Sequence, residues 1–202
     1  MGGHAAGDVA SRMVVEALTS FTADRAVADC IDDLEDRLLE ANRKCLSIVE
    51  SDDIPQGMGS TVAVMFAAGN QCFVLWAGDS RIYRARGERF DQLTEDHSLV
   101  QEMFALGHLT IEEAEAHPSA NIITRAVGVA EKLFVDIDHV EVEAGDRFLL
   151  CSDGLTRDLR DEEIAALLSD GSPTQACQQL LNAALERGGG DNTTVIVVEA
   201  GL

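Results

Sequence analysis

The N-terminal quarter of the chain has the periodicity of amphipathic helices. Between residues 27 and 48, apolar side chains recur at alternating spacings of four and three residues, which places them on one face of a long helix. These positions are Val27, Ile31, Leu34, Leu38, Ala41, Cys45 and Ile48. A shorter helix is predicted from Asp8, which is placed to cap it, to Leu18. Pro55 and Gly57 then end the helical region.

Short apolar runs rich in β-branched and aromatic residues begin at residue 60 and predict strands. Tight turns join four of these runs into two hairpins, residues 60–68 with 71–77 and residues 82–84 with 89–93. Consecutive strands joined in this way pair antiparallel, because parallel strands need a long crossover connection. Further strands are predicted over residues 133–142, 147–151 and 193–198.

Helical patterns separate the later strands. Short helices are predicted over residues 97–106 and 110–117, and longer ones over residues 161–168 and 174–187. The polar segment between residues 96 and 123 interrupts the strands and is either a lid over a site or a surface insertion. The order of helices, antiparallel strands, helices and a last strand predicts an α+β fold, with sheet packed on sheet and helices outside.

The charge composition argues against some classes of binding partner. The chain has 202 residues with 15 Lys and Arg against 36 Asp and Glu, a net charge of −21, which argues against binding to nucleic acid or to an anionic membrane. No apolar run approaches the roughly 18 residues of a membrane span, and no signal peptide is recognisable at the N-terminus. The five cysteines are widely spaced and odd in number, which predicts reduced thiols and a cytoplasmic location.

Two carboxylates stand at the ends of predicted core strands. Asp153 directly follows the apolar run 148–151, and Asp191 precedes the last strand behind three glycines. A carboxylate at the mouth of a buried strand is costly unless something compensates its charge. Asp153 is therefore either a turn-capping residue or, together with Asp191, a ligand of a hard cation such as Mg²⁺ or Mn²⁺. Metal-assisted hydrolysis is the hypothesis that follows from the second interpretation.

Several short motifs occur along the chain, at Met1–Gly7, Gly57–Thr61, Ala77–Arg81, Leu93–Ser98, Asn121–Gly128, Cys151–Leu155 and Gly190–Thr194. In sequence and in order they resemble the metal-dependent serine/threonine protein phosphatases, the PPM or PP2C family, in their bacterial form. Each motif alone is a weak signal, and their common order is a strong one. The resemblance implies a four-layer α-β-β-α sandwich, in which two antiparallel sheets pack face to face between helices. It also implies a single phosphatase domain over residues 1–202, with a flap at about 97–122.

The resemblance further implies hydrolysis of phosphoserine and phosphothreonine in proteins, by water activated at two Mg²⁺ or Mn²⁺ ions. By motif match, Asp153 and Asp191 are ligands of these ions. Asp79 is either a ligand of a third, weaker ion or a β-turn residue. His4 is either a proton donor to the leaving hydroxyl or an ordinary loop histidine. The implied partners are phosphorylated proteins made by a serine/threonine kinase, and a monomer is expected.

Two further residues of the family's motifs, His97 and Arg125, are expected to hold the junctions between the strands and the flap rather than to act on substrate. Both lie where the predicted strands meet the polar segment, so a structural role is the simpler interpretation.

The match departs from the family's pattern at the N-terminus. Residues 1–4 resemble the tail of the motif Asp-Gly-Met-Gly-Gly-His, whereas the Asp-Gly and the preceding Arg-x-x-Asn-Glu-Asp motif do not occur in the chain. The sequence therefore predicts an N-terminally truncated domain, in which Met1 is either an internal methionine of a longer phosphatase or a true start. The alternative function is a catalytically impaired PPM-like domain that binds phosphoproteins or has a regulatory role.

We predict that residues 1–202 alone hydrolyse phosphopeptides slowly or not at all, because the family's phosphate-binding Arg and further acidic ligands are not in them. Mn²⁺ titration calorimetry beside phosphopeptide hydrolysis measures this. Tight binding of two Mn²⁺ ions with ordinary turnover would contradict the prediction.

Overall fold

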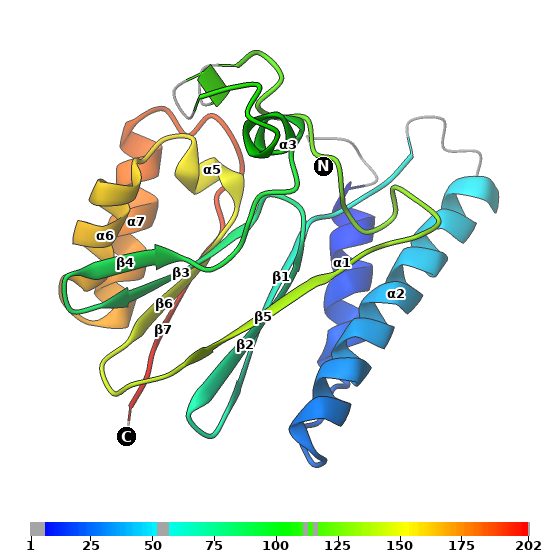
Figure 1. Ribbon diagram of the computed structural model, residues 1–202, viewed down its shortest axis with the longest axis horizontal. Helices are drawn as coiled ribbons and strands as arrows, with labels where there is room; N and C mark the ends of the chain where they lie inside the picture. Colours follow the sequence, from blue (N-terminus) through cyan, green and yellow to red (C-terminus); the bar gives the residue numbers. More distant parts are fainter. Residues whose placement is uncertain (1–6, 52–56, 111–112, 115–116, 202) are drawn as a thin grey trace. The chain divides into compact units, whose positions relative to one another are not determined.

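The computed structural model describes residues 7–51, 57–110, 113–114 and 117–201 (Figure 1). The chain divides into two compact units. Unit 1 comprises Met1–Val64, Leu75–Gly78 and His97–Ile137, and unit 2 comprises Met65–Val74, Asp79–Asp96 and Asp138–Leu202. Each unit is described by itself below.

The strands form two sheets, as the resemblance implied. The first has the order β1-β2-β5 and its residues belong to both units; the second has the order β4-β3-β6-β7 and lies in unit 2. The bounds are β1 Val62–Ala68, β2 Gln71–Ala77, β3 Arg81–Arg86, β4 Arg89–Gln92, β5 Asp136–Glu141, β6 Arg147–Cys151 and β7 Val195–Glu199. The two predicted hairpins are present as β1-β2 and β3-β4. Antiparallel sheets with flanking helices confirm the predicted α+β class.

Helices precede the strands and separate several of them. Their bounds are α1 Gly7–Thr19, α2 Val27–Ser51, α3 Leu99–Ala105, α5 Asp153–Thr156, α6 Asp161–Ser169 and α7 Pro173–Glu186. The short helix α5 was not predicted, because Ser152-Asp153-Gly154 has the composition of a turn. Among the described residues, no helix has both the length and the apolar character that a membrane crossing requires.

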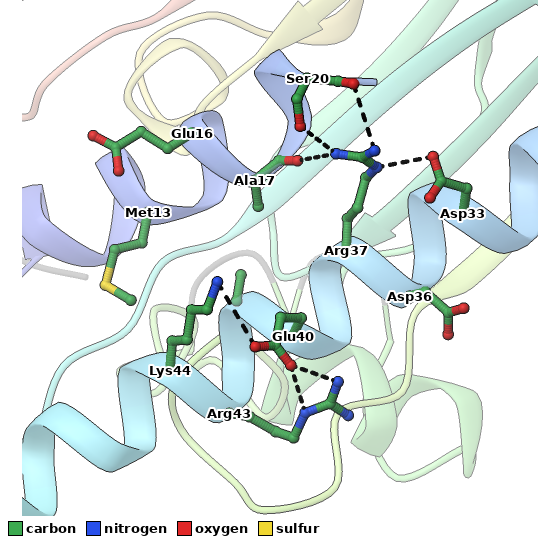
Figure 2. Close-up of a pocket in the computed structure, with 11 residues that line it drawn as sticks. Met13, Glu16, Ala17, Ser20, Asp33, Asp36, Arg37, Glu40, Arg43 and Lys44 are labelled. Atoms are coloured by element: carbon green, nitrogen blue, oxygen red, sulfur yellow. Dashed lines mark hydrogen bonds and ion pairs between the residues drawn. The ribbon is translucent and has the colours of Figure 1, made fainter. Parts of the chain in front are cut away.

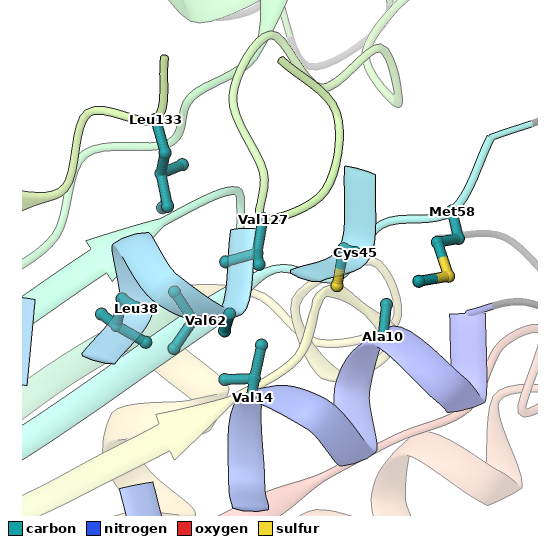
Figure 3. Close-up of a cluster of buried hydrophobic side chains, with 10 residues drawn as sticks. Ala10, Val14, Leu38, Cys45, Met58, Val62, Val127 and Leu133 are labelled. Atoms are coloured by element: carbon teal, nitrogen blue, oxygen red, sulfur yellow. The ribbon is translucent and has the colours of Figure 1, made fainter. Parts of the chain in front are cut away.

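In unit 1, α1 and α2 lie side by side and bury the apolar face that the sequence predicted (Figure 1). Leu38, Ala41 and Cys45 of α2 are almost completely buried, as is Ala10 of α1. Figure 3 shows these helix residues converging with strand and loop residues on one cluster. The cluster comprises Ala10, Val14, Leu38, Ala41, Cys45, Met58, Val62, Ala77, Val127 and Leu133.

The buried face of α2 also carries one polar residue, Asn42, which is 1% exposed. Its Oδ1 accepts a hydrogen bond from the backbone N–H of Gly128 at 2.6 Å, and its Nδ2 donates to the carbonyl of Ala130 at 2.9 Å. Gly128 has φ +85°, and a Cβ there would lie 2.6 Å from the carbonyl oxygen of Met58. The side chain of Asn42 therefore satisfies the buried N–H of Gly128 and links helix α2 to this glycine loop.

In unit 1, the two ends of the segment 97–124 meet each other. Ser98 forms a β-bridge with Ile123, and the N–H of Thr124 donates to the carbonyl of His97 at 2.8 Å. His97 is buried, and its Nδ1 accepts the N–H of Gly78 at 3.0 Å while its Nε2 lies 3.2 Å from Asp136. Arg125 also pairs with Asp136. Both residues therefore hold this junction, as expected from the sequence.

In unit 2, α6 and α7 cover one face of the sheet β4-β3-β6-β7 (Figure 1). Tyr83 of β3 is opposite Leu149 of β6, which is opposite Val197 of β7. Because side chains alternate along a strand, these residues share one face and pack against the helices. The helical partners are Ile164 and Leu168 of α6 and Leu180 and Ala184 of α7.

We predict that Asn42→Ala lowers the free energy of unfolding by about 1–3 kcal/mol, because it leaves the buried N–H of Gly128 without a partner. Urea denaturation measures the change. Asn182→Ala, at an exposed position of α7, is the matched control and should change stability by less than about 0.5 kcal/mol. Equal effects of the two variants would contradict the structural role of Asn42.

Candidate metal centre

The antiparallel pairing of β6 and β7 brings two of the predicted site residues to the same end of one sheet. Cys151, the last residue of β6, is opposite Val195, the first residue of β7. Asp153 begins α5 two residues after β6, and Asp191 lies in the loop that leads into β7. We refer to Asp153 and Asp191 as the aspartate pair.

Hydrogen bonds fix the two loops to each other just beyond the strands. The N–H of Ser152 donates to the carbonyl of Thr194 at 3.2 Å, and the N–H of Thr194 donates to Ser152 Oγ at 2.9 Å. Ser152 Oγ also donates to the carbonyl of Asn192 at 3.2 Å. A Cβ on Gly154 would lie 2.5 Å from that carbonyl oxygen, so only glycine allows this approach. The backbone positions of the aspartate pair are therefore coupled.

One cationic side chain joins the aspartate pair. The guanidinium of Arg157 donates to Asp191 Oδ2 at 2.9 Å and forms an ion pair with Asp153 Oδ2. The three side chains are between 26% and 39% exposed, so water screens the pairs but does not surround them. The two carboxylates thus converge on a single positive group.

Asp79 lies in the turn between β2 and β3 and interacts electrostatically with the same cluster. Burial and, to a smaller extent, the nearby charges of Asp153 and Asp96 raise the pKa of Asp79 to about 6, while Arg157 acts in the opposite direction. Asp96 is held in place by Arg81, whose Nε lies 2.9 Å from Asp96 Oδ1. Asp79 therefore sits where negative charge exceeds the positive charge that the described side chains supply.

The residues present fit a divalent cation. Arg157 stands in for a cation at the aspartate pair, and carboxylate oxygens are the ligands that Mg²⁺ and Mn²⁺ prefer. Within the described ranges, no three His, Cys, Asp or Glu side chains are already arranged around one ion position. Hard cations of this kind keep several water ligands, so two carboxylates with a third nearby are a reasonable partial set.

The structure thus brings Asp153 and Asp191 together and places Asp79 within electrostatic reach of Asp153. His4 lies outside the described residues. Sequence reasoning missed Arg157, although it follows Asp153 by four residues, a spacing at which opposite charges meet on a helix. It also missed the support that Arg81 gives to Asp96, which depends on strand register.

A separate pocket lies in unit 1 between α1 and α2 (Figure 2). Its central basic residue, Arg37, donates to the carbonyl of Ala17 at 2.8 Å and to Ser20 Oγ at 2.7 Å, and its Nε donates to Asp33 at 2.9 Å. Glu40 pairs with Arg43 and Lys44. These charges satisfy one another and the end of α1, so the pocket offers no comparable site.

Comparison with known proteins agrees with the motifs. A family model described as protein phosphatase 2C matches residues 1–187. Protein phosphatase PhpP of Streptococcus pneumoniae is 39% identical over 202 residues, which span 98% of this chain and 82% of PhpP. The serine/threonine phosphatase PstP/Ppp of Mycobacterium tuberculosis has a crystal structure with a TM-score of 0.93 and 36% identity, covering 100% of this chain and 86% of that one. The PstP catalytic domain solved with two manganese ions gives a TM-score of 0.88 at 35% identity, over 100% of this chain and 84% of that one.

We predict that, without metal, the stability of the chain falls as pH rises through about 6, and that Asp79→Asn removes this component. The folded-state pKa of Asp79 lies above its unfolded value, so its contribution is fully present below about pH 4 and lost above about pH 6. With allowance for solvent screening, the difference in the free energy of unfolding between the unchanged chain and Asp79→Asn should change by about 1–2 kcal/mol over this pH range. Urea denaturation in EDTA from pH 4.5 to 7.5 measures it.

The control is Asp32→Asn, at an exposed position of α2, whose stability should run parallel to that of the unchanged chain over the same pH range. If Asp79→Asn also ran parallel, the raised pKa of Asp79 would be wrong.

Proposed function

The chain belongs to the protein phosphatase 2C family, and we propose that Asp153 and Asp191, with Asp79 beside them, hold the divalent cations with which it hydrolyses phosphoserine and phosphothreonine in proteins. The family supplies the reaction class. The geometry of the site supports the assignment of these three aspartates as metal ligands.

The observation that carries the proposal is the convergence of the aspartate pair on one cationic group. Two carboxylates from different loops share the guanidinium of Arg157 at the end of the sheet where β6 stops and β7 starts. Without a positive charge, such a pair would be costly to hold together. A site that already binds one cation through two anionic oxygens has the chemistry that Mg²⁺ or Mn²⁺ requires.

A bound Mg²⁺ or Mn²⁺ would lower the pKa of a water molecule and offset charge on a phosphate. The protein's own residues do the rest of the positioning. The backbone around the aspartate pair is fixed by the hydrogen bonds of Ser152 and the close approach at Gly154, which keeps the two loops that carry the carboxylates together. In a chain with a net charge of −21, bound cations are the most direct means of receiving a dianionic phosphate.

The number of ions and their identity belong to this proposal. We assign the aspartate pair to a two-ion centre and Asp79 to a third, weaker site. The manganese ions of PstP are a property of that protein and support the choice of Mn²⁺ as a probe here. The raised pKa of Asp79 agrees with a residue that would gain from a nearby cation.

We further propose that residues 1–202 act as one phosphatase domain, with residues 97–122 as its flap. The match of the family model to residues 1–187 supports the first part. The bridge between Ser98 and Ile123 supports the second, because it ties the two ends of the segment together, and the described residues between them lie outside the named strands. His4 remains the proposed proton donor.

For the biological setting, we propose a monomeric cytoplasmic enzyme that reverses the action of a serine/threonine kinase. The cysteines support the location. All five are free thiols, and Cys30, Cys45, Cys72 and Cys151 are buried, as is usual for proteins of a reducing compartment. Burial raises the pKa of the Cys72 thiol to about 11, which makes it unreactive.

We predict that, in a chain extended at its N-terminus by the family's Arg-x-x-Asn-Glu-Asp and Asp-Gly motifs, Asp153→Asn and Asp191→Asn each lower Mn²⁺-dependent hydrolysis of a phosphopeptide by at least about 100-fold, since a hard cation loses an anionic oxygen ligand. Steady-state kinetics and Mn²⁺ calorimetry on the same samples measure rate and binding. The matched control is Glu162→Gln, which removes one negative charge from the exposed surface of α6. It should change neither the rate of hydrolysis nor the binding of Mn²⁺.

A variant of either aspartate that kept its rate at ordinary Mn²⁺ concentration would not be missing a metal ligand, and that assignment would be withdrawn. Comparing a phosphopeptide with a small aryl phosphate tests the substrate class. Faster hydrolysis of the aryl phosphate relative to the peptide would contradict a protein substrate.

A further inference from the structure

We propose that Arg157 is an internal competitor of the divalent cation at the aspartate pair. Its guanidinium holds both carboxylates when no cation is bound, and it has to release them when a cation takes its place. The inference rests on the proposed function, because it requires Asp153 and Asp191 to be metal ligands. It adds a residue that sets how tightly this chain binds metal.

The first observation that supports the proposal is the set of groups that the guanidinium of Arg157 contacts. One nitrogen lies 2.9 Å from Asp191 Oδ2 and another pairs with Asp153 Oδ2. Within the part of the chain that the structure describes, the side chain of Arg157 forms ion pairs with these two carboxylates and with no others. The carboxylate oxygens that contact Arg157 are the atoms that a metal cation would need as ligands.

Two other arginines of unit 2, Arg147 and Arg86, are anchored differently. Arg147 pairs with Glu199 but also donates to the carbonyls of Leu168 and Gly171. Arg86 pairs with the buried Asp146 and donates to the carbonyl of Glu141. Such backbone bonds tie a side chain to the fold. Arg157 has none among the described contacts of its side chain, so leaving the aspartate pair breaks no such bond.

The backbone of Arg157 is fixed even though its side chain is held only by the carboxylates. It ends the short helix α5, and its N–H donates to the carbonyl of Asp153 at 2.9 Å. Leu155, within the same turn, is completely buried. The side chain is 39% exposed, so the guanidinium can turn out into water without moving α5. Competition by rotation of one side chain is therefore possible.

Competition by Arg157 predicts the direction in which the metal affinity changes when its guanidinium is removed. A cation that displaces Arg157 must overcome a charge-assisted hydrogen bond to Asp191 and an ion pair with Asp153, and if the guanidinium stays close it also repels the incoming charge. Removing the guanidinium should therefore tighten metal binding. A residue that merely supported the aspartate pair in its binding geometry would have the opposite effect, since its loss would weaken binding. The direction of the change decides between the two roles.

The experiment compares the full 202-residue chain with Arg157→Ala and Arg157→Lys by Mn²⁺ titration, following free Mn²⁺ by electron paramagnetic resonance from micromolar to millimolar concentration. We expect Arg157→Ala to lower the Kd by about tenfold. The Kd of Arg157→Lys should lie between those of the unchanged chain and Arg157→Ala, because a lysine is a point charge that cannot bridge two carboxylates as a guanidinium does. Arg43→Ala, which removes the same charge from an exposed pair with Glu40 in unit 1, should leave the Kd unchanged.

A second measurement shows whether each variant is folded and whether the ion pairs exist. In EDTA, Arg157→Ala should lower the melting temperature, and Mn²⁺ should raise it by more than in the unchanged chain, because the freed carboxylates then depend on the cation. If Arg157→Ala does not fold, the same comparison is made with Arg157→Lys.

An equal or higher Kd in Arg157→Ala, with Mn²⁺ bound by the unchanged chain, would overturn the role of Arg157 and leave the metal site standing. If neither the unchanged chain nor any Arg157 variant bound Mn²⁺, the metal site itself would be wrong and this inference with it. The two failures are therefore distinguishable.

Discussion

Carboxylates that are brought together at the end of a folded sheet repel one another, and the fold has to supply positive charge among them. Asp153 and Asp191 meet because β6 and β7 are antiparallel neighbours, and Asp79 lies within electrostatic reach of Asp153. Their mutual repulsion is a fixed consequence of this topology. The excess of acidic residues in the whole chain adds to it, since the net charge is −21. The chemistry of the site follows from how this negative charge is compensated.

The backbone keeps the carboxylates together against that repulsion. Ser152 bonds to Thr194 and Asn192, and Gly154 lets two loops approach so closely that any side chain would collide. Packing behind the site supports the same arrangement, because Leu149 and Leu155 are buried in the core shared with α6 and α7. The apolar core therefore provides the free energy that holds like charges at one position, as expected of a functional site that is not optimised for stability alone.

The parts of this arrangement that depend on local pattern could be predicted from the sequence. The amphipathic period of α2, the hairpins and the strand ends at Asp153 and Asp191 are all visible as runs and breaks in the chain. Contacts between distant residues were not visible. Asn42 looks like an ordinary polar residue of a helix until it is seen to bond Gly128, which is 86 residues away. Arg157 could have been noticed from its spacing to Asp153, but its second partner, Asp191, required the tertiary fold.

Two features of the site respond to the same excess of negative charge. Asp79 holds a proton more readily than an ordinary aspartate, with a pKa of about 6, and Arg157 places its guanidinium between the aspartate pair. Proton uptake and an ion pair are the compensations that a protein makes from its own groups. A divalent cation would replace both, because it neutralises more charge at shorter distance than either. Metal binding as proposed for this site would therefore be an exchange, in which a guanidinium is released and Asp79 loses its tendency to keep a proton. The affinity of the site would then depend on the cost of that exchange as well as on the number of oxygen ligands.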